Sequence, residues 1–184
     1  MAASPDVTNL IRLFDDCFKH TENTILVKGD DEPIYIPANE SQPHNQVIFA
    51  HGYFSSALHE ISHWCIAGKE RREKVDFGYW YEPDGRTVEQ QQAFEVVEIK
   101  PQALEWIFSI AAGIKFNISA DNLGGIVSPT AGLFEENVRF QALEYLEKGL
   151  PENARQFTEV LSNHYGTRSQ LVVNAFKLKG GSNT

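Results

Sequence analysis

The sequence predicts a helix-rich α+β domain with a small sheet, and three observations lead to this fold class. The chain has 184 residues, of which 42% are hydrophobic and 22% charged, as in an ordinary globular domain. The short β-branched runs that predict strands lie in the first half of the chain. Helical spacing of apolar residues dominates the rest. We therefore expect one domain over residues 1–184, with a frayed tail from about residue 180.

A helix followed by three short strands is expected at the start of the chain. Ser4 and Pro5 provide an N-cap and a first-turn proline, and apolar residues then recur at helical spacing, which predicts a helix over 5–19. A polar loop is expected over 37–45. Short runs rich in β-branched residues predict strands at 24–27, 34–36 and 47–50.

The middle of the chain predicts a second helix that leads into an aromatic strand. The helix should begin at residue 55 or 56 and end near residue 67, because Gly68 follows as a stop signal. The charged segment 69–74 is expected to be a solvated connection. Residues 75–81 are aromatic and strand-like.

The second half of the chain predicts a helical layer. Residues 87–112 have a helical pattern, which we expect to be broken or kinked at Pro101. Segment 117–130 contains glycines and a proline, so it is expected to be irregular. Two or three closing helices are expected, near 131–148, 152–164 and 168–177.

Charge and composition exclude several classes of protein. Sixteen Lys and Arg against 25 Asp and Glu give a net charge of −9, so a basic footprint for nucleic acid is absent. The most apolar stretch, 106–114, is far shorter than the roughly 20 residues of a membrane span. The first residues lack the pattern of a signal peptide, and the two cysteines form no CxxC pair. We therefore expect a cytoplasmic protein with reduced thiols and with no nucleic acid or membrane partner.

One motif in the chain carries chemistry, the HExxH sequence at 59–63. His59 and His63 are four residues apart, so both imidazoles lie on one helix face and can reach one metal ion. In HExxH metallopeptidases the glutamate, here Glu60, is the general base that activates a metal-bound water. The alternative is that these are two ordinary histidines on a partly exposed helix.

A metal site also needs a third protein ligand. The metzincin extension, with a glycine and a histidine shortly after the second motif histidine, is absent. Two glutamates of a following helix are candidates, Glu95 and Glu98. We favour Glu98, because Gln102 lies one turn further and could bond a ligand imidazole, as metal sites usually require. Glu95 has Ile99 at the same spacing, which cannot do so.

Two histidines and one carboxylate also form the facial triad of non-haem iron oxygenases, and the pattern does not distinguish Zn²⁺ from Fe²⁺. Oxygenases of the double-stranded β-helix fold carry an HxD or HxE motif on a strand. The predicted strands of this chain contain none, so a 2-oxoglutarate dioxygenase of that fold is not expected.

Three further residues are candidates for a substrate pocket. His51 follows the third strand and precedes the HExxH helix, so it either lines the same pocket or is a core or capping histidine. Tyr79 and Trp80 belong to the aromatic segment and could stack on a substrate chain. The alternative for both aromatic residues is burial in the core.

Longer motifs surround these residues and resemble one family. They lie at 28–35, 49–52, 59–68, 75–81, 97–106 and 121–123. Over about residues 5–165 the chain resembles the bacterial elongation factor P hydroxylase family. The resemblance implies a cytoplasmic protein hydroxylase with a metallopeptidase (zincin)-like α+β core. It places the metal ligands at His59, His63 and Glu98, and leaves open what Glu60 does in an oxidation.

The substrate implied by this resemblance is elongation factor P, at a lysine that already carries a β-lysyl group. Hydroxylation would be the last step of that modification, and would require O₂ and a reductant that the sequence does not identify. The leading interpretation is an Fe²⁺-dependent hydroxylase, with Zn²⁺ as an ion that purified protein can carry. Two alternatives stay open: a minimal zinc metallopeptidase with Glu60 as base, and a non-catalytic protein that binds elongation factor P.

Overall fold

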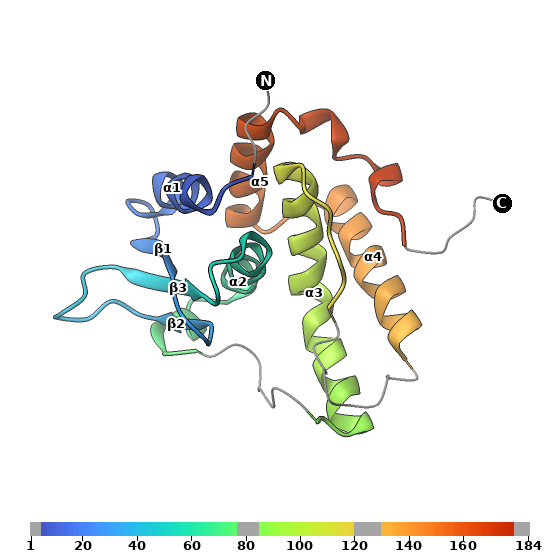
Figure 1. Ribbon diagram of the computed structural model, residues 1–184, viewed down its shortest axis with the longest axis horizontal. Coiled ribbons are helices and arrows are strands. Elements are labelled where there is room, and N and C mark those ends of the chain that lie inside the picture. The colour runs from blue at the N-terminus through green and yellow to red at the C-terminus, as the bar shows by residue number, and fades with distance from the viewer. Residues whose placement is uncertain (1–4, 77–84, 120–129, 179–184) are drawn as a thin grey trace.

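A computed structural model describes residues 5–76, 85–119 and 130–178, and it confirms a helix-rich α+β fold with a small sheet (Figure 1). Helix α2 lies between the sheet and helix α3, and α4 lies on the other side of α3. Along the chain, the elements are α1 (Val7–Phe18), β1 (Thr24–Lys28), β2 (Ile34–Ile36), β3 (Asn45–Phe49), α2 (Phe54–Ile66), α3 (Val88–Ala112), α4 (Ala131–Lys148) and α5 (Glu152–Tyr165), with short 3₁₀ turns at Arg71–Glu73, Arg168–Gln170 and Val173–Ala175.

The sheet has the strand order β1-β3-β2. Strands β1 and β2 lie where they were predicted, and β3 begins two residues before its predicted start, within the predicted loop. Strand β3 runs parallel to β1 and antiparallel to β2. Beyond β2, the backbone of Tyr35 forms a bridge with Asp76, with N–O distances of 2.7 and 3.0 Å. Within the strand predicted at 75–81, Asp76 therefore forms this bridge to the sheet. The rest of that segment, from residue 77, lies outside the described part of the chain.

Helix α2 is buried on one face and carries the HExxH histidines on another. Leu58 and Ile61 are fully buried, and Trp64 is 3% exposed. The Trp64 ring makes edge contacts with Phe14 and Phe18 of α1, with centroids 5.2 and 4.8 Å apart. This apolar face fixes the helix against the core and leaves the histidine face directed at α3.

A tight turn between β3 and α2 sets the start of this helix. His51 and Gly52 both have positive φ angles, 56° and 68°. A Cβ on Gly52 would lie 2.5 Å from Cε of Lys28, a flexible side-chain end that can move, so the positive φ is the stronger reason for glycine there. The His51 N–H donates to the carbonyl of Asp30 at 2.8 Å, which ties the turn to the loop after β1. Helix α2 therefore begins at Phe54, close to the predicted start.

Helix α3 is one continuous helix of 25 residues, so of the break or kink that we expected at Pro101, the break does not occur. Its N-terminus has a capping box, in which Thr87 and Gln90 bond to each other's backbone N–H. Pro101 is buried, and α3 packs against α2, α4 and α5, so tertiary packing holds the helix through the proline. Among the described residues, no helix is both long enough and apolar enough to cross a membrane.

Two predictions at the chain ends are wrong. Helix α1 is capped by Asp6, whose carboxylate accepts the N–H of Asn9 at 3.1 Å, instead of by Ser4, which lies outside the described residues. The helix predicted at 168–177 is replaced by two 3₁₀ turns. Phe176 is buried there against Trp106, and its carbonyl accepts from Arg139, so these tertiary contacts determine the path of the segment.

Candidate metal centre

Helix α3 carries a stripe of buried polar side chains on an otherwise apolar, buried surface. Their spacing of three or four residues places them on one helix face. Each is between 1% and 8% exposed, and buried polar groups require partners. The stripe consists of Gln91, Glu95, Glu98, Gln102, Glu105 and Ser109.

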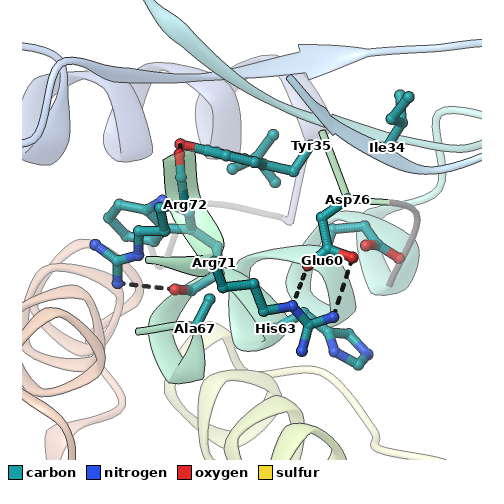
Figure 2. A pocket seen from close by; sticks show the side chains of 10 residues that line it. Ile34, Tyr35, Glu60, His63, Ala67, Arg71, Arg72 and Asp76 are labelled. Carbon is teal, nitrogen blue, oxygen red and sulfur yellow. Dashed lines mark hydrogen bonds and ion pairs between the residues drawn. The ribbon is translucent and has the colours of Figure 1, made fainter. Parts of the chain in front are cut away.

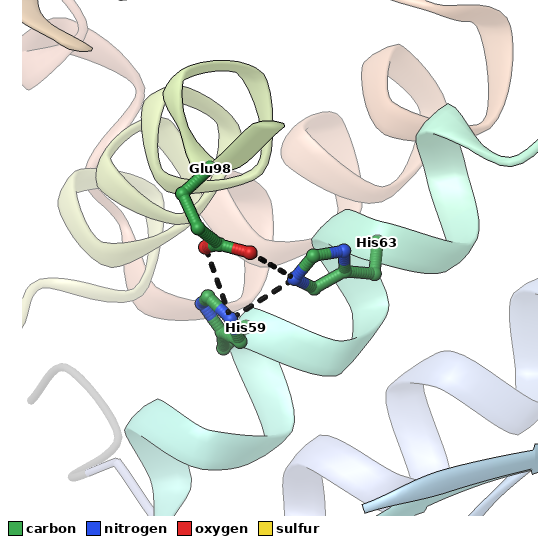
Figure 3. A group of neighbouring side chains, drawn as sticks. All are labelled: His59, His63 and Glu98. Carbon is green, nitrogen blue, oxygen red and sulfur yellow. Dashed lines mark hydrogen bonds and ion pairs between the residues drawn. The ribbon is translucent and has the colours of Figure 1, made fainter. Parts of the chain in front are cut away.

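The middle of this stripe faces the two histidines of α2 (Figure 3). Nε2 of His63 lies 3.0 Å from Nε2 of His59 and 3.2 Å from Oε1 of Glu98. Nε2 of His59 lies 3.5 Å from Oε2 of Glu98. One potential ligand atom from each residue lies within 4.8 Å of the others. The structure therefore brings together the three side chains that the sequence proposed as metal ligands.

The hydrogen bond on the other nitrogen of His59 shows which tautomer faces this cluster. Nδ1 of His59 lies 2.8 Å from Oε2 of Glu105. A carboxylate only accepts, so Nδ1 carries the proton, and Nε2 of the neutral ring presents a lone pair. With His63 in its Nδ1–H tautomer, its Nε2 and the Glu98 carboxylate are acceptors as well, and a cation between the three groups would satisfy them. Imidazole nitrogen and carboxylate oxygen suit zinc, iron and similar divalent ions.

The electrostatics of the cluster also favour positive charge at this position. Although burial opposes protonation, Glu98 and Glu105 raise the pKa of His59 to about 10. Burial likewise opposes ionisation of Glu98, yet the two histidines hold its pKa below the usual range. Without a metal, a proton compensates the carboxylates, and a metal ion would compete with that proton for the same nitrogen.

Gln102 supports the site in a different way from the prediction. We expected it to bond a ligand imidazole, but its Nε2 lies 3.4 Å from Oε2 of Glu98. The same amide pairs with the backbone of Ser119, donating to the carbonyl at 2.6 Å and accepting from the N–H at 3.1 Å. Gln102 thus contacts the carboxylate and also holds the segment after α3 against the helix.

Glu95, the alternative third ligand, has a different environment. Its carboxylate accepts from the hydroxyl of Thr130 at 2.7 Å and from the amide of Gln91 at 3.4 Å. In the described part of the chain, the group whose ligand atoms converge contains Glu98 and does not contain Glu95. The geometry therefore favours Glu98.

A cavity of about 470 Å³ opens beside the triad. His59, Glu60 and Glu98 line its inner part. Exposed residues line its mouth, among them Asp31, His51, Lys115 and Asn117. His51 thus lies in the cavity lining, as one of its two sequence-based interpretations proposed, whereas Tyr79 and Trp80 lie outside the described residues. The cavity is large enough for a long side chain.

A much smaller cavity, of about 30 Å³, lies behind Glu60 and His63 (Figure 2). Tyr35 lines it from β2, and an ion pair between Arg71 and Asp76 borders it. This volume holds about one or two water molecules. Of these two cavities, the larger one has room for a substrate side chain.

Glu105 is a site residue that the sequence prediction missed. The signal was present, because Glu105 follows Glu98 by seven residues and so lies two turns along the same face of α3. The contact of Gln102 with Ser119 had no comparable signal, since a segment without regular structure has no sequence period that places it against a helix.

Comparisons with known proteins agree with the resemblance seen in the sequence. The family described as elongation factor P hydroxylase matches residues 13–176. A Haemophilus influenzae protein named elongation factor P lysine hydroxylase is 52% identical over 168 residues, which cover 91% of this chain and 94% of that protein. Both comparisons span α2 and α3, the helices that carry the triad. The chain therefore belongs to the elongation factor P hydroxylase family.

Proposed function

We propose that this chain is a metal-dependent hydroxylase of elongation factor P. Its substrate is the lysine that already carries a β-lysyl group, and hydroxylation is the last step of that modification. The observation that carries the proposal is the triad of His59, His63 and Glu98 beside a large cavity, in a chain of the elongation factor P hydroxylase family.

The metal that we propose is iron. In a site of two histidines and one carboxylate, Fe²⁺ supplies redox chemistry with O₂ that zinc lacks. Zinc nevertheless binds such sites more tightly than ferrous iron. Purified protein can therefore carry zinc and be inactive, and this result alone would not indicate a peptidase.

The side chains around the triad have separate tasks in this proposal. His59, His63 and Glu98 hold the ion, and the cavity admits the lysine side chain. Glu60 lines the cavity next to the triad, and its carboxyl group orders water or the substrate ammonium there. At the cavity mouth, the carboxylate of Asp31 suits a cationic side chain, whereas Lys115 opposes one, so the attraction comes from the Asp31 side of the mouth.

The overall reaction needs more than the protein and its metal. One C–H bond and O₂, with two electrons and two protons, give one C–OH bond and one water. The electrons come from an external two-electron donor.

The alternative function is a zinc metallopeptidase, and one observation favours it. Glu60 follows His59 in an HExxH helix and lines the same cavity, as a general base for water would. In that case the cavity binds an extended peptide and no oxygen is transferred.

The intact mass of elongation factor P tests the proposal in cells. A strain without this protein should yield elongation factor P that is lighter by one oxygen atom. The parent protein and a Glu95→Gln variant should restore the mass, because Glu95 lies outside the triad. His63→Ala should not restore it. An unchanged mass in the deletion strain would contradict the hydroxylase function.

A reconstituted reaction separates the hydroxylase from the peptidase. Fe²⁺-loaded protein with O₂ and a reductant should add one oxygen to β-lysylated elongation factor P, and zinc-loaded protein should add none. If the zinc form cleaves peptide bonds and no iron condition transfers oxygen, the peptidase is the better description.

A further inference from the structure

Glu105 contacts the side of the His59 ring that points away from the triad. Its Oε2 lies 2.8 Å from Nδ1, whereas Nε2 of the same ring faces His63 and Glu98. The two nitrogens of an imidazole point in different directions, so a carboxylate bonded at Nδ1 does not reach an ion bound at Nε2. The contact of Glu105 with this site is therefore its hydrogen bond to His59.

We propose that Glu105 is a positioning residue that holds His59 as the Nδ1–H tautomer and thereby sets the affinity of the site for a divalent metal. The proposal rests on the metal site of the proposed function. An imidazole without such a partner populates both tautomers and rotates about its χ angles, and only one arrangement presents the Nε2 lone pair to the ion. Partners of this kind are typical of metal-binding histidines.

His59 needs this restraint more than His63 does. Both side chains line the large cavity, but that of His59 is 26% exposed and that of His63 is 14% exposed. Packing therefore restricts the His59 ring less, and the hydrogen bond must supply more of its orientation.

Glu105 is well placed to supply that orientation. It is 8% exposed and lies on α3, two turns from Glu98 on the same polar stripe. One rigid helix thus carries both the ligand carboxylate and the carboxylate that orients a ligand. A small shift of α3 would move both together, so their relative geometry is fixed by the helix itself.

The test compares the zinc affinity of three variants with that of the parent. Zinc is the probe because it is redox-inert and bound zinc can be measured by competition with a chelator. Glu105→Ala should bind zinc about 10–100-fold more weakly, the usual cost of losing such a partner. Glu105→Gln keeps an oxygen that can accept from Nδ1, so its loss should be clearly smaller. Glu95→Gln is the matched control: this carboxylate is equally buried on the same stripe but bonds Thr130, so zinc affinity should not change.

Nitrogen-15 NMR of the histidine rings provides a readout that a general loss of structure would not mimic. In zinc-loaded parent protein, His59 should show a protonated Nδ1, and this signal should weaken in Glu105→Ala and persist in Glu105→Gln. Thermal melting of the metal-free variants identifies a variant that fails to fold. If Glu105→Ala does not fold, the zinc affinity and the Nδ1–H signal of Glu105→Gln test the proposal instead.

Two results would overturn the proposal. The first is a folded Glu105→Ala variant with parental zinc affinity. The second is a Glu105→Gln variant that loses zinc as completely as His59→Ala while its Nδ1–H signal persists, because Glu105 would then act through charge or as a ligand. Neither readout requires hydroxylation, so a chain with Glu105-dependent zinc binding and no hydroxylase activity would support this inference and refute the proposed function.

Discussion

The two faces of helix α2 differ in what they contact and in what they contribute. One face places Leu58, Ile61 and Trp64 in the hydrophobic core. The other presents His59 and His63 to the carboxylates of α3. The same helix therefore separates the part of the molecule that stabilises the fold from the part that we propose for chemistry, and substitutions on the two faces should have different consequences.

The energies of the two faces explain this separation. Complete burial of a large apolar side chain contributes about 1.5–3 kcal/mol, and Trp64 shares its cluster with Phe14, Phe18 and Phe157. Buried charged groups contribute little net stability, because their desolvation offsets their attraction. The apolar face therefore provides most of the stability, and the polar face contributes little to it, as a face that we propose for metal binding would.

The largest expected effect is the loss of metal when a histidine of the triad is removed. His59→Ala and His63→Ala should each lose most bound metal and all hydroxylation, because two remaining ligands hold an ion poorly. Metal content by elemental analysis and the thermal melt of metal-free protein measure the two properties. A double variant that still binds one metal per chain would contradict the assignment of both ligands.

The third ligand can be tested by a matched pair on α3. Glu98→Ala should lose metal and hydroxylation, whereas Glu95→Ala should keep both, since Glu95 bonds Thr130 and Gln91. Elemental analysis of the two purified variants makes the comparison. The opposite pattern, with metal lost only in Glu95→Ala, would reverse the assignment.

A substitution on the apolar face should lower the stability of the protein and leave metal binding intact, the opposite of a substitution in the triad. Ile61 lies between the two histidines in sequence but is fully buried in the core. Ile61→Ala should cost about 2–5 kcal/mol of unfolding free energy, as large-to-small core changes do. Chemical denaturation measures this cost, and the folded protein should still bind one metal. Metal loss without loss of stability would mean that the two faces are not separable.

The motif-bearing part of the fold was the most predictable from sequence. The spacing of His59 and His63 on a helix, and the helical pattern around Glu98, are local properties of the chain, so the sequence alone is enough to propose the triad. Glu105 was missed although its spacing from Glu98 contains the same information. A supporting side chain was expected one turn from the ligand, at Gln102, whereas the residue that bonds a ligand imidazole lies two turns away.

Features fixed by distant contacts were not predictable in the same way. The helical pattern at 168–177 is overridden because Phe176 is buried against Trp106. The expected break at Pro101 is prevented by packing of α3 against its neighbouring helices. In both cases the local preference is about 1–3 kcal/mol at most, which tertiary contacts readily exceed.

A smaller effect is expected at Gln102, which touches the site but binds no metal itself. Gln102→Ala removes the contact with Glu98 and the two hydrogen bonds with Ser119. We expect zinc affinity to fall by about 10-fold, the low end for residues that support a ligand. Competition with a chelator measures the change. A loss as complete as that of Glu98→Ala would show that Gln102 does more than support the carboxylate.

The smallest effect concerns the two thiols, which belong to the apolar side of the comparison. Burial, with a smaller contribution from Asp16, raises the pKa of Cys17 to about 11, and burial also raises the pKa of Cys65. The reactive thiolate is therefore scarce near pH 8, and we expect neither thiol of native protein to react with a disulfide reagent until denaturant exposes both. Rapid reaction of one thiol in native protein at pH 8 would contradict this.

The raised pKa of Cys17 also predicts how the stability of the protein depends on pH. Because the folded-state pKa of Cys17 lies above its ordinary value of 9.0, the folded protein retains a proton that the unfolded chain releases. The resulting stabilisation is fully present below the unfolded pKa and is lost as the pH rises through about 11. Denaturant titrations between these pH values should show a decline in unfolding free energy that Cys17→Ala reduces. A decline of the same size in the variant would mean that other groups cause the pH dependence. Hydroxylation at neutral pH should be unchanged in the variant, because Cys17 lies on α1 and is not part of the triad.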